Sequence, residues 1–158
     1  MRKLLHLGLI LTTAATLATL ASSPASAKPS LSPADFTFTV QTSTTISTRM
    51  IGNTTIITAD RTSILAGTYA GEANDTVVLI LHPNGVADAA GAGTCQCTVD
   101  GRSGTLHYAF EGSGPFPASA SGRYAAWGSD GLATLRGSGP FSGSWLVAEG
   151  TGYYAFGQ

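Results

Sequence analysis

The sequence predicts a single all-β domain, folded as an antiparallel β-barrel of about eight strands. Three observations predict this fold class. Glycine is abundant, with 20 residues among 158, and charged residues make up only 11%. Short runs of Thr, Val, Ile, Tyr and Phe recur between the glycines, a composition typical of many-stranded β domains. No stretch carries the apolar stripe of an amphipathic helix.

The N-terminal segment predicts export. Arg2 and Lys3 precede a mostly apolar stretch over residues 4–20, and Pro24-Ala25-Ser26-Ala27 has the small residues of a cleavage site. This pattern is typical of a secretory signal peptide. We therefore expect residues 1–27 to be a signal peptide, cleaved after Ala27, and the protein to be secreted into the extracellular space.

The remaining chain has the length of about one domain. Residues 28–34 contain two prolines and predict a flexible leader, and residues 35–158 predict the single barrel domain. Two of the eight Lys and Arg residues lie in the signal peptide, so six remain against nine Asp and Glu. No basic patch appears, which argues against a nucleic-acid partner. The mature chain lacks a second long apolar run, so we expect no membrane span in it.

The first half of the domain divides into strands at its turn residues. Gly52-Asn53 predicts a hairpin turn and Asn74-Asp75 a second turn. Val77 to Leu81 are apolar on both faces, so we expect the most buried strand there. The expected strands, in order, cover 36–48, 54–62, 68–73 and 77–81.

The second half follows the same logic. Pro83-Asn84-Gly85 and residues 100–104 predict turns around a glycine-rich strand over 86–99, which we expect to be bulged or bent. Gly112–Phe116 recurs exactly 25 residues later as 137–141, which predicts two equivalent turns at strand ends. The remaining expected strands cover 105–111, 123–127, 132–136, 145–149 and 152–156. Closing this many strands into a barrel removes exposed edges.

Three motifs carry a family resemblance. They are Leu81-His82-Pro83-Asn84-Gly85, then Val99-Asp100-Gly101-Arg102-Ser103-Gly104-Thr105-Leu106, and then residues 128–139. In this order they resemble the DUF3224 family of uncharacterised bacterial proteins. The resemblance implies an allene oxide cyclase-like or dirigent-like barrel with a central cavity for a small, mostly apolar molecule. It also implies a homo-oligomer, because dirigent-like barrels oligomerise, and it supplies no catalytic pattern.

Cys95 and Cys97 are the two cysteines of the chain. In an extended strand they share a face but lie too far apart for a disulfide, so a bend or bulge is needed to close the gap, and Gly91 and Gly93 just before the pair favour one. An oxidising compartment favours the bonded pair. The alternatives are free thiols, an intermolecular bridge or a redox or metal site. Zinc or copper(I) would need both histidines of the mature chain, His82 and His107, yet their spacing matches no zinc finger, so we expect no metal.

His107 and Glu111 are the candidates for acid–base chemistry. They share one face of an expected strand, and Leu106, Tyr108 and Phe110 share the other. The alternation favours the apolar set inside and leaves His107 and Glu111 in water. The opposite facing would place a general acid or base in the lumen, with a partner subunit covering the aromatic side chains.

No hydrolase, metalloprotease or cofactor motif appears, so no catalytic residue and no cofactor is predicted. Three functions stay open. The first is a secreted binding module that holds a small apolar molecule in its lumen. The second is a cyclase or isomerase acting on a hydrophobic substrate, with Glu111 or His107 as its ionisable group. The third is a structural or protein-interaction protein with a packed core and an apolar surface patch.

Overall fold

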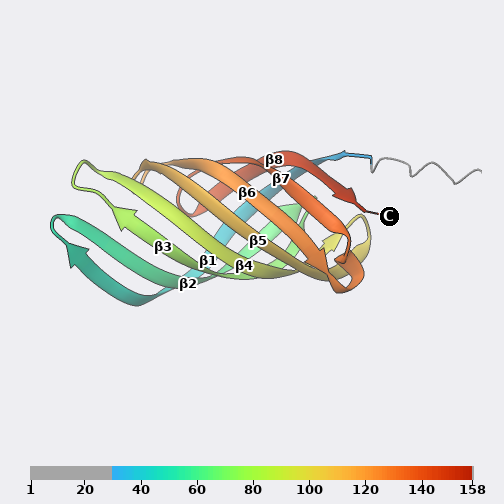
Figure 1. Ribbon diagram of the computed structural model, residues 1–158, viewed down its shortest axis with the longest axis horizontal. Helices are drawn as coiled ribbons and strands as arrows, with labels where there is room; N and C mark the ends of the chain where they lie inside the picture. The colour runs from blue at the N-terminus through green and yellow to red at the C-terminus, as the bar shows by residue number, and fades with distance from the viewer. Residues whose placement is uncertain (1–29, 158) are drawn as a thin grey trace, which may run out of the picture.

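The chain forms a closed antiparallel barrel of eight strands, each paired with its neighbours in sequence, with the last strand paired to the first (Figure 1). The computed structural model describes residues 30–157; the expected signal peptide and its cleavage site lie outside these residues. The strands are β1 Ser32–Ile51, β2 Thr54–Gly67, β3 Ala70–Leu81, β4 Val86–Val99, β5 Arg102–Pro115, β6 Ala120–Ser129, β7 Leu135–Gly143 and β8 Val147–Phe156, with a 3-10 turn, η1 Asp130–Leu132, between β6 and β7. The predicted fold class is therefore confirmed.

The first strand starts earlier than expected. Ser32, Pro33 and Ala34 fall in the segment predicted to be a flexible leader, yet they pair with β8 in the closing seam of the barrel. Ala34 points inward and is buried. Burying this side chain and completing the ladder stabilise the segment as strand despite its prolines.

The predicted turn at Asn74-Asp75 is wrong, because β3 runs through it without interruption. The reason is that Asp75 points into the barrel, where other side chains satisfy its carboxylate. The apolar run over 77–81 is also less buried than expected, since Val78 is 38% exposed. A single closed sheet has only one inner face, so the alternate residues of any strand meet solvent.

Two further expectations about local shape are corrected. Of the two shapes expected for β4, the bulge is absent, because β4 pairs residue by residue with β3 from Ala87 to Thr98 and with β5 from Val86 to Val99. The bulges lie instead in β1, between Val40 and Thr42 and between Thr45 and Ser47. The repeated glycine motif does not form two equivalent turns, because residues 137–141 lie inside β7 whereas Gly112–Phe116 finishes β5.

Glycines on three strands make room for aromatic rings inside the barrel. Three inward phenylalanines each lie opposite a glycine on the adjacent strand. A Cβ atom on any of these glycines would collide with the facing ring. The pairs are Phe36 with Gly150, Phe110 with Gly91 and Phe141 with Gly122. These glycines are therefore needed for space inside the barrel, because each one leaves room for an aromatic ring packed over the strand.

The two ends of the barrel differ in their filling. The packed end comprises the β2–β3 and β4–β5 turns, η1, the start of β1 and the end of β8; it lies near the C-terminus label in Figure 1. Side chains fill it completely, and those with almost no exposed surface are Tyr69, Val99, Cys95, Cys97, Leu106, Leu132 and Leu135. The cavity end, opposite, carries the four hairpin connections β1–β2, β3–β4, β5–β6 and β7–β8.

Candidate ligand-binding cavity

The barrel interior contains a cavity of about 90 Å³ toward the cavity end. Most of its wall is aromatic or aliphatic, and the rings come from four strands and two connections. The cavity reaches the surface below the β7–β8 turn, since its lining includes Leu146, which is 62% exposed. The aromatic lining residues are Phe36, Phe38, Tyr69, Tyr108, Phe110, Tyr124, Phe141 and Trp145.

Trp145 fastens the β7–β8 turn across the mouth of the cavity. Its indole Nε1–H donates a hydrogen bond to the carbonyl oxygen of Pro115 at 3.0 Å. Its ring also packs edge-on against Phe116, with centroids 5.6 Å apart. Both contacts link the β7–β8 turn to the β5–β6 connection, so these two connections together frame the entrance.

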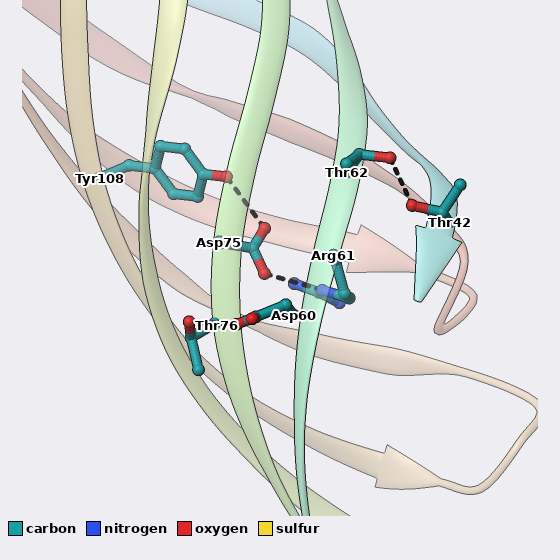
Figure 2. Close-up of polar contacts among 7 residues, drawn as sticks. All are labelled: Thr42, Asp60, Arg61, Thr62, Asp75, Thr76 and Tyr108. Carbon is teal, nitrogen blue, oxygen red and sulfur yellow. Dashed lines mark hydrogen bonds and ion pairs between the residues drawn. The ribbon is translucent and has the colours of Figure 1, made fainter. Parts of the chain in front are cut away.

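A buried ion pair stands in the cavity wall (Figure 2). The Arg61 Nε–H donates to Asp75 Oδ1 at 2.8 Å, and the Tyr108 hydroxyl donates to Asp75 Oδ2 at 2.9 Å. The Asp75 side chain is fully buried and that of Arg61 is 11% exposed. Arg61 is among the residues that line the cavity and Asp75 is not, and both also border a second, more open hollow beside β2 and β3. Burying a carboxylate requires this compensation, because an unpaired buried charge costs several kcal/mol.

Two rings hold the guanidinium of Arg61 in place. Its Cζ lies 5.4 Å from the centroid of Phe38 and 5.2 Å from that of Phe110, within the range of cation–π attraction. Burial, and then the charge of Asp75 beside its hydroxyl, raise the pKa of Tyr108. Tyr108 therefore stays protonated at neutral pH and keeps donating to Asp75. The result is a fixed cation whose charge is already balanced.

Two tyrosine hydroxyls between the cavity and the packed end have no hydrogen-bond partner within residues 30–157. They belong to Tyr69 and Tyr124, whose hydroxyl oxygens are covered by protein atoms. Burial is the main cause that raises the pKa of both phenols. An unpaired buried hydroxyl lowers the stability of the folded state. Both tyrosine rings offset this cost through edge-on contacts with Phe36, whose ring centroid lies 5.0 Å from each of theirs.

The predicted acid–base candidates lie on the outside of the barrel. Leu106 and Tyr108 are buried inside, as the alternation indicates, so His107 and Glu111 face outward. His107 stacks on Trp127 at 5.9 Å between centroids, and Glu111 is exposed opposite Arg123 of β6. Neither residue lines the cavity.

The outer face brings His107, Ser129 and Asp130 together without forming a catalytic triad. His107 Nε2 and Ser129 Oγ lie 3.1 Å apart, and Asp130 Oδ2 accepts hydrogen bonds from Ser129 and from Thr105. In a triad the carboxylate orients the imidazole, whereas here it contacts the serine. The cluster also lies on the wall away from the cavity, so the geometry does not support nucleophilic catalysis.

Cys95 and Cys97 form a disulfide inside the barrel, with Cα atoms 5.2 Å apart. Both are almost completely buried, at 0% and 2% exposure. The strand is shortened locally without a bulge, and the neighbouring strand accommodates this at Gly71, where a Cβ atom would collide with the carbonyl oxygen of Gln96. The predicted disulfide is present, and burial of both sulfurs argues against a redox site.

The alternative site of two cysteines and two histidines does not assemble. His82 pairs with Asp88 at the β3–β4 hairpin, with Nε2 and Oδ2 2.8 Å apart, and His107 lies outside on β5. Over the described range, no group of three or more His, Cys, Asp or Glu side chains could hold a metal ion.

Sequence reasoning missed Arg61 and Asp75. Each is the one charged residue among inward residues that are otherwise small or apolar. These inward residues occupy alternate positions from Ala59 to Leu65 on β2 and from Ala73 to Val77 on β3. A charge in an inward row on each of two neighbouring strands was the available signal. The expected turn at residues 74–75 hid it, because a turn residue would be solvated.

The fold and cavity define a small up-and-down barrel with an internal space that opens at one end. No family model and no curated protein matches the chain. Among solved structures, the chain is similar to a protein of unknown function from the DUF3224 family of Shewanella oneidensis MR-1. The two are 12% identical over 83% of this chain and 99% of that chain, with a TM-score of 0.64. This likeness shows a shared fold, in agreement with the resemblance carried by the motifs.

Proposed function

We propose that this protein is a secreted binding module that holds one small apolar molecule in its lumen. The observation that carries the proposal is the aromatic-lined cavity, which reaches the surface at one end of an otherwise packed barrel. Apolar cavities with a few fixed polar groups are the usual form of small-molecule sites. The N-terminal pattern and the disulfide support an oxidising compartment outside the cytosol.

The size of the cavity limits the ligand. Its volume of about 90 Å³ is smaller than the roughly 150 Å³ of an engineered apolar cavity that binds benzene. A single small ring or the end of a short chain therefore matches the enclosed space, with any larger part of the molecule standing in the mouth near Leu146 and Trp145.

The cyclase or isomerase alternative has less support. The residues that line the cavity include no carboxylate and no imidazole, and its tyrosines have raised pKa values. A general base works best with a pKa near the working pH, which none of these phenols has. The packed structural protein is also less favoured, because that hypothesis predicts no cavity.

A titration with methylenecyclopentane, a small cyclic hydrocarbon, tests the proposal. Saturable shifts in the amide NMR signals of cavity residues are expected in the wild-type protein. Ala126 lines the cavity and its neighbour Ala125 points outward, so Ala126→Leu fills the space and Ala125→Leu is the matched control. We expect Ala126→Leu to abolish the shifts and Ala125→Leu to keep them.

The absence of saturable shifts in the wild-type protein would overturn the proposal, as would equal binding by Ala126→Leu. Thermal unfolding of both variants shows whether either has lost its fold. Native mass spectrometry of the protein from a secreting bacterial host then measures the mass of any molecule that is released on denaturation, which bounds the natural ligand.

A further inference from the structure

The guanidinium of Arg61 has hydrogen-bond donors that the protein leaves free. A guanidinium carries five N–H donors, and the contact with Asp75 uses the one on Nε. The two terminal nitrogens have no hydrogen-bond partner in the described part of the chain, and they keep some accessible surface, since they are not among its covered unpaired polar atoms. Arg61 is also the one charged residue in the described lining of the cavity.

The free donors are held in a fixed position. Asp75 holds the Nε side of the group, and the rings of Phe38 and Phe110 lie within cation–π range of its carbon. A donor positioned in this way loses little further entropy when a ligand binds, which favours recognition of an acceptor atom. The two unpaired tyrosine hydroxyls do not compete for that acceptor, because protein atoms cover them.

The charge balance decides between a neutral and an anionic acceptor. Asp75 is fully buried and compensates Arg61, and Tyr108 occupies its second oxygen. The lumen is therefore neutral overall. A carboxylate ligand would bring an uncompensated charge into an apolar space, which is costly. A carbonyl oxygen would accept a charge-assisted hydrogen bond without adding a net charge.

We propose that the ligand is a small, neutral carbonyl compound, and that the terminal nitrogens of Arg61 donate hydrogen bonds to its oxygen while its apolar part contacts the aromatic wall. This inference rests on the proposed function and adds the chemical class of the ligand. It assigns Arg61 as the residue that selects the ligand and Asp75 as the residue that positions Arg61.

Two isosteric probes test the inference. Cyclopentanone and methylenecyclopentane differ only in C=O against C=CH₂, and cyclopentanecarboxylate adds the anionic case. The dissociation constants are measured for the wild-type protein, for the double variant Arg61→Met with Asp75→Asn, and for Asp60→Asn. Asp60 lies on the outer face of β2, bonded to Thr76 at 2.6 Å, and is the matched control.

The measured quantity is the preference for the ketone over the hydrocarbon, taken as the ratio of the two dissociation constants. Comparing this ratio between proteins cancels the different hydration of the two probes. We expect the double variant to lower the preference about tenfold, the effect of one hydrogen bond to a charged donor. Asp60→Asn should leave it unchanged, and the carboxylate should bind more weakly than the ketone to the wild-type protein.

A second measurement needs no variant. In the wild-type protein labelled with nitrogen-15 in arginine, cyclopentanone should shift the Nη signals of Arg61 and methylenecyclopentane should not. Binding of both probes with no change of ratio and no Nη shift would overturn this inference and leave the proposed function standing. If the wild-type protein bound cyclopentanecarboxylate more tightly than cyclopentanone, the inferred neutral carbonyl ligand would be wrong and a carboxylic acid would take its place. Failure of every probe to bind would overturn the proposed function itself.

Discussion

The packed end and the cavity end are built from the same eight strands but are filled in opposite ways. At the packed end, η1 inserts Leu132 beside Leu135, and Tyr154 closes the rim by donating to Asp100 Oδ2 at 2.6 Å. At the cavity end, rings stand over glycines, and an ion pair replaces aliphatic packing. Backbone pairing is thus common to both ends, and the side chains alone decide which end is solid.

This difference teaches that close packing and open interior space occupy separate parts of the lumen. Close packing at one end supplies most of the fully buried apolar area. The other end leaves space and tolerates a buried charge pair, which adds little net stability compared with an apolar equivalent. Substitutions at the two ends should therefore differ in kind, and the following predictions run from the largest expected effect to the smallest.

Asp75→Ala should have the largest effect, lowering the free energy of unfolding by about 4 kcal/mol, because it leaves the charge of Arg61 buried and unpaired. Asp60→Ala removes an exposed carboxylate next to Arg61 on the opposite face of β2 and should cost less than about 1 kcal/mol. Urea unfolding followed by circular dichroism measures both. Equal costs for the two would show that the inner ion pair is not structurally required.

Leu135→Ala should lower the free energy of unfolding by about 3 kcal/mol, because Leu135 has no exposed surface at the packed end and its loss leaves a hole. Leu146→Ala, at the mouth of the cavity, should change it by less than about 0.5 kcal/mol. The same urea experiment compares them. A large cost for Leu146→Ala would mean that the cavity mouth is part of the packed core.

Alkaline pH should destabilise the protein through its buried tyrosines. Burial raises the pKa of Tyr69 above the ordinary 10.0, so the folded state holds its proton more tightly than the unfolded state. The stabilisation is complete below pH 10.0 and is lost as the pH rises further, by roughly 1.4 kcal/mol per pH unit for each such tyrosine.

Urea midpoints measured between pH 8 and 11 check this slope. Tyr69→Phe should make it shallower, whereas Tyr153→Phe should leave it unchanged, because that side chain is 61% exposed. Identical slopes for all three proteins would exclude Tyr69 as a source of the alkaline instability.

The smallest expected effect is none at all. Mild reductant and iodoacetamide should leave Cys95 and Cys97 unmodified in the folded protein, because both sulfurs lie inside the packed part of the barrel. Denaturant with the same reagents should add two carbamidomethyl groups, detected by intact mass. Labelling of the native protein at a similar rate would show that the packed end opens readily.

The sequence predicts the barrel well and the site poorly, for a physical reason. Strand alternation and turn glycines are local signals, so the fold class and the inward facing of Leu106, Tyr108 and Phe110 could be read from the chain. Arg61 and Asp75 meet across two strands, and their register depends on pairing that no local pattern encodes. Asn74-Asp75 also carries a genuine turn composition, which is overridden by pairing with both neighbouring strands and by the buried contacts of Asp75.

The three pairs of phenylalanine and glycine imply that the lumen has an adjustable size. Each ring lies against the main chain of a glycine on the neighbouring strand. Replacing Phe36, Phe110 or Phe141 by a smaller residue would enlarge the cavity, at the cost of ring contacts such as those of Phe36 with Tyr69 and Tyr124. The volume of the cavity is therefore set by the side chains at three positions of the barrel and not by the pairing of its strands.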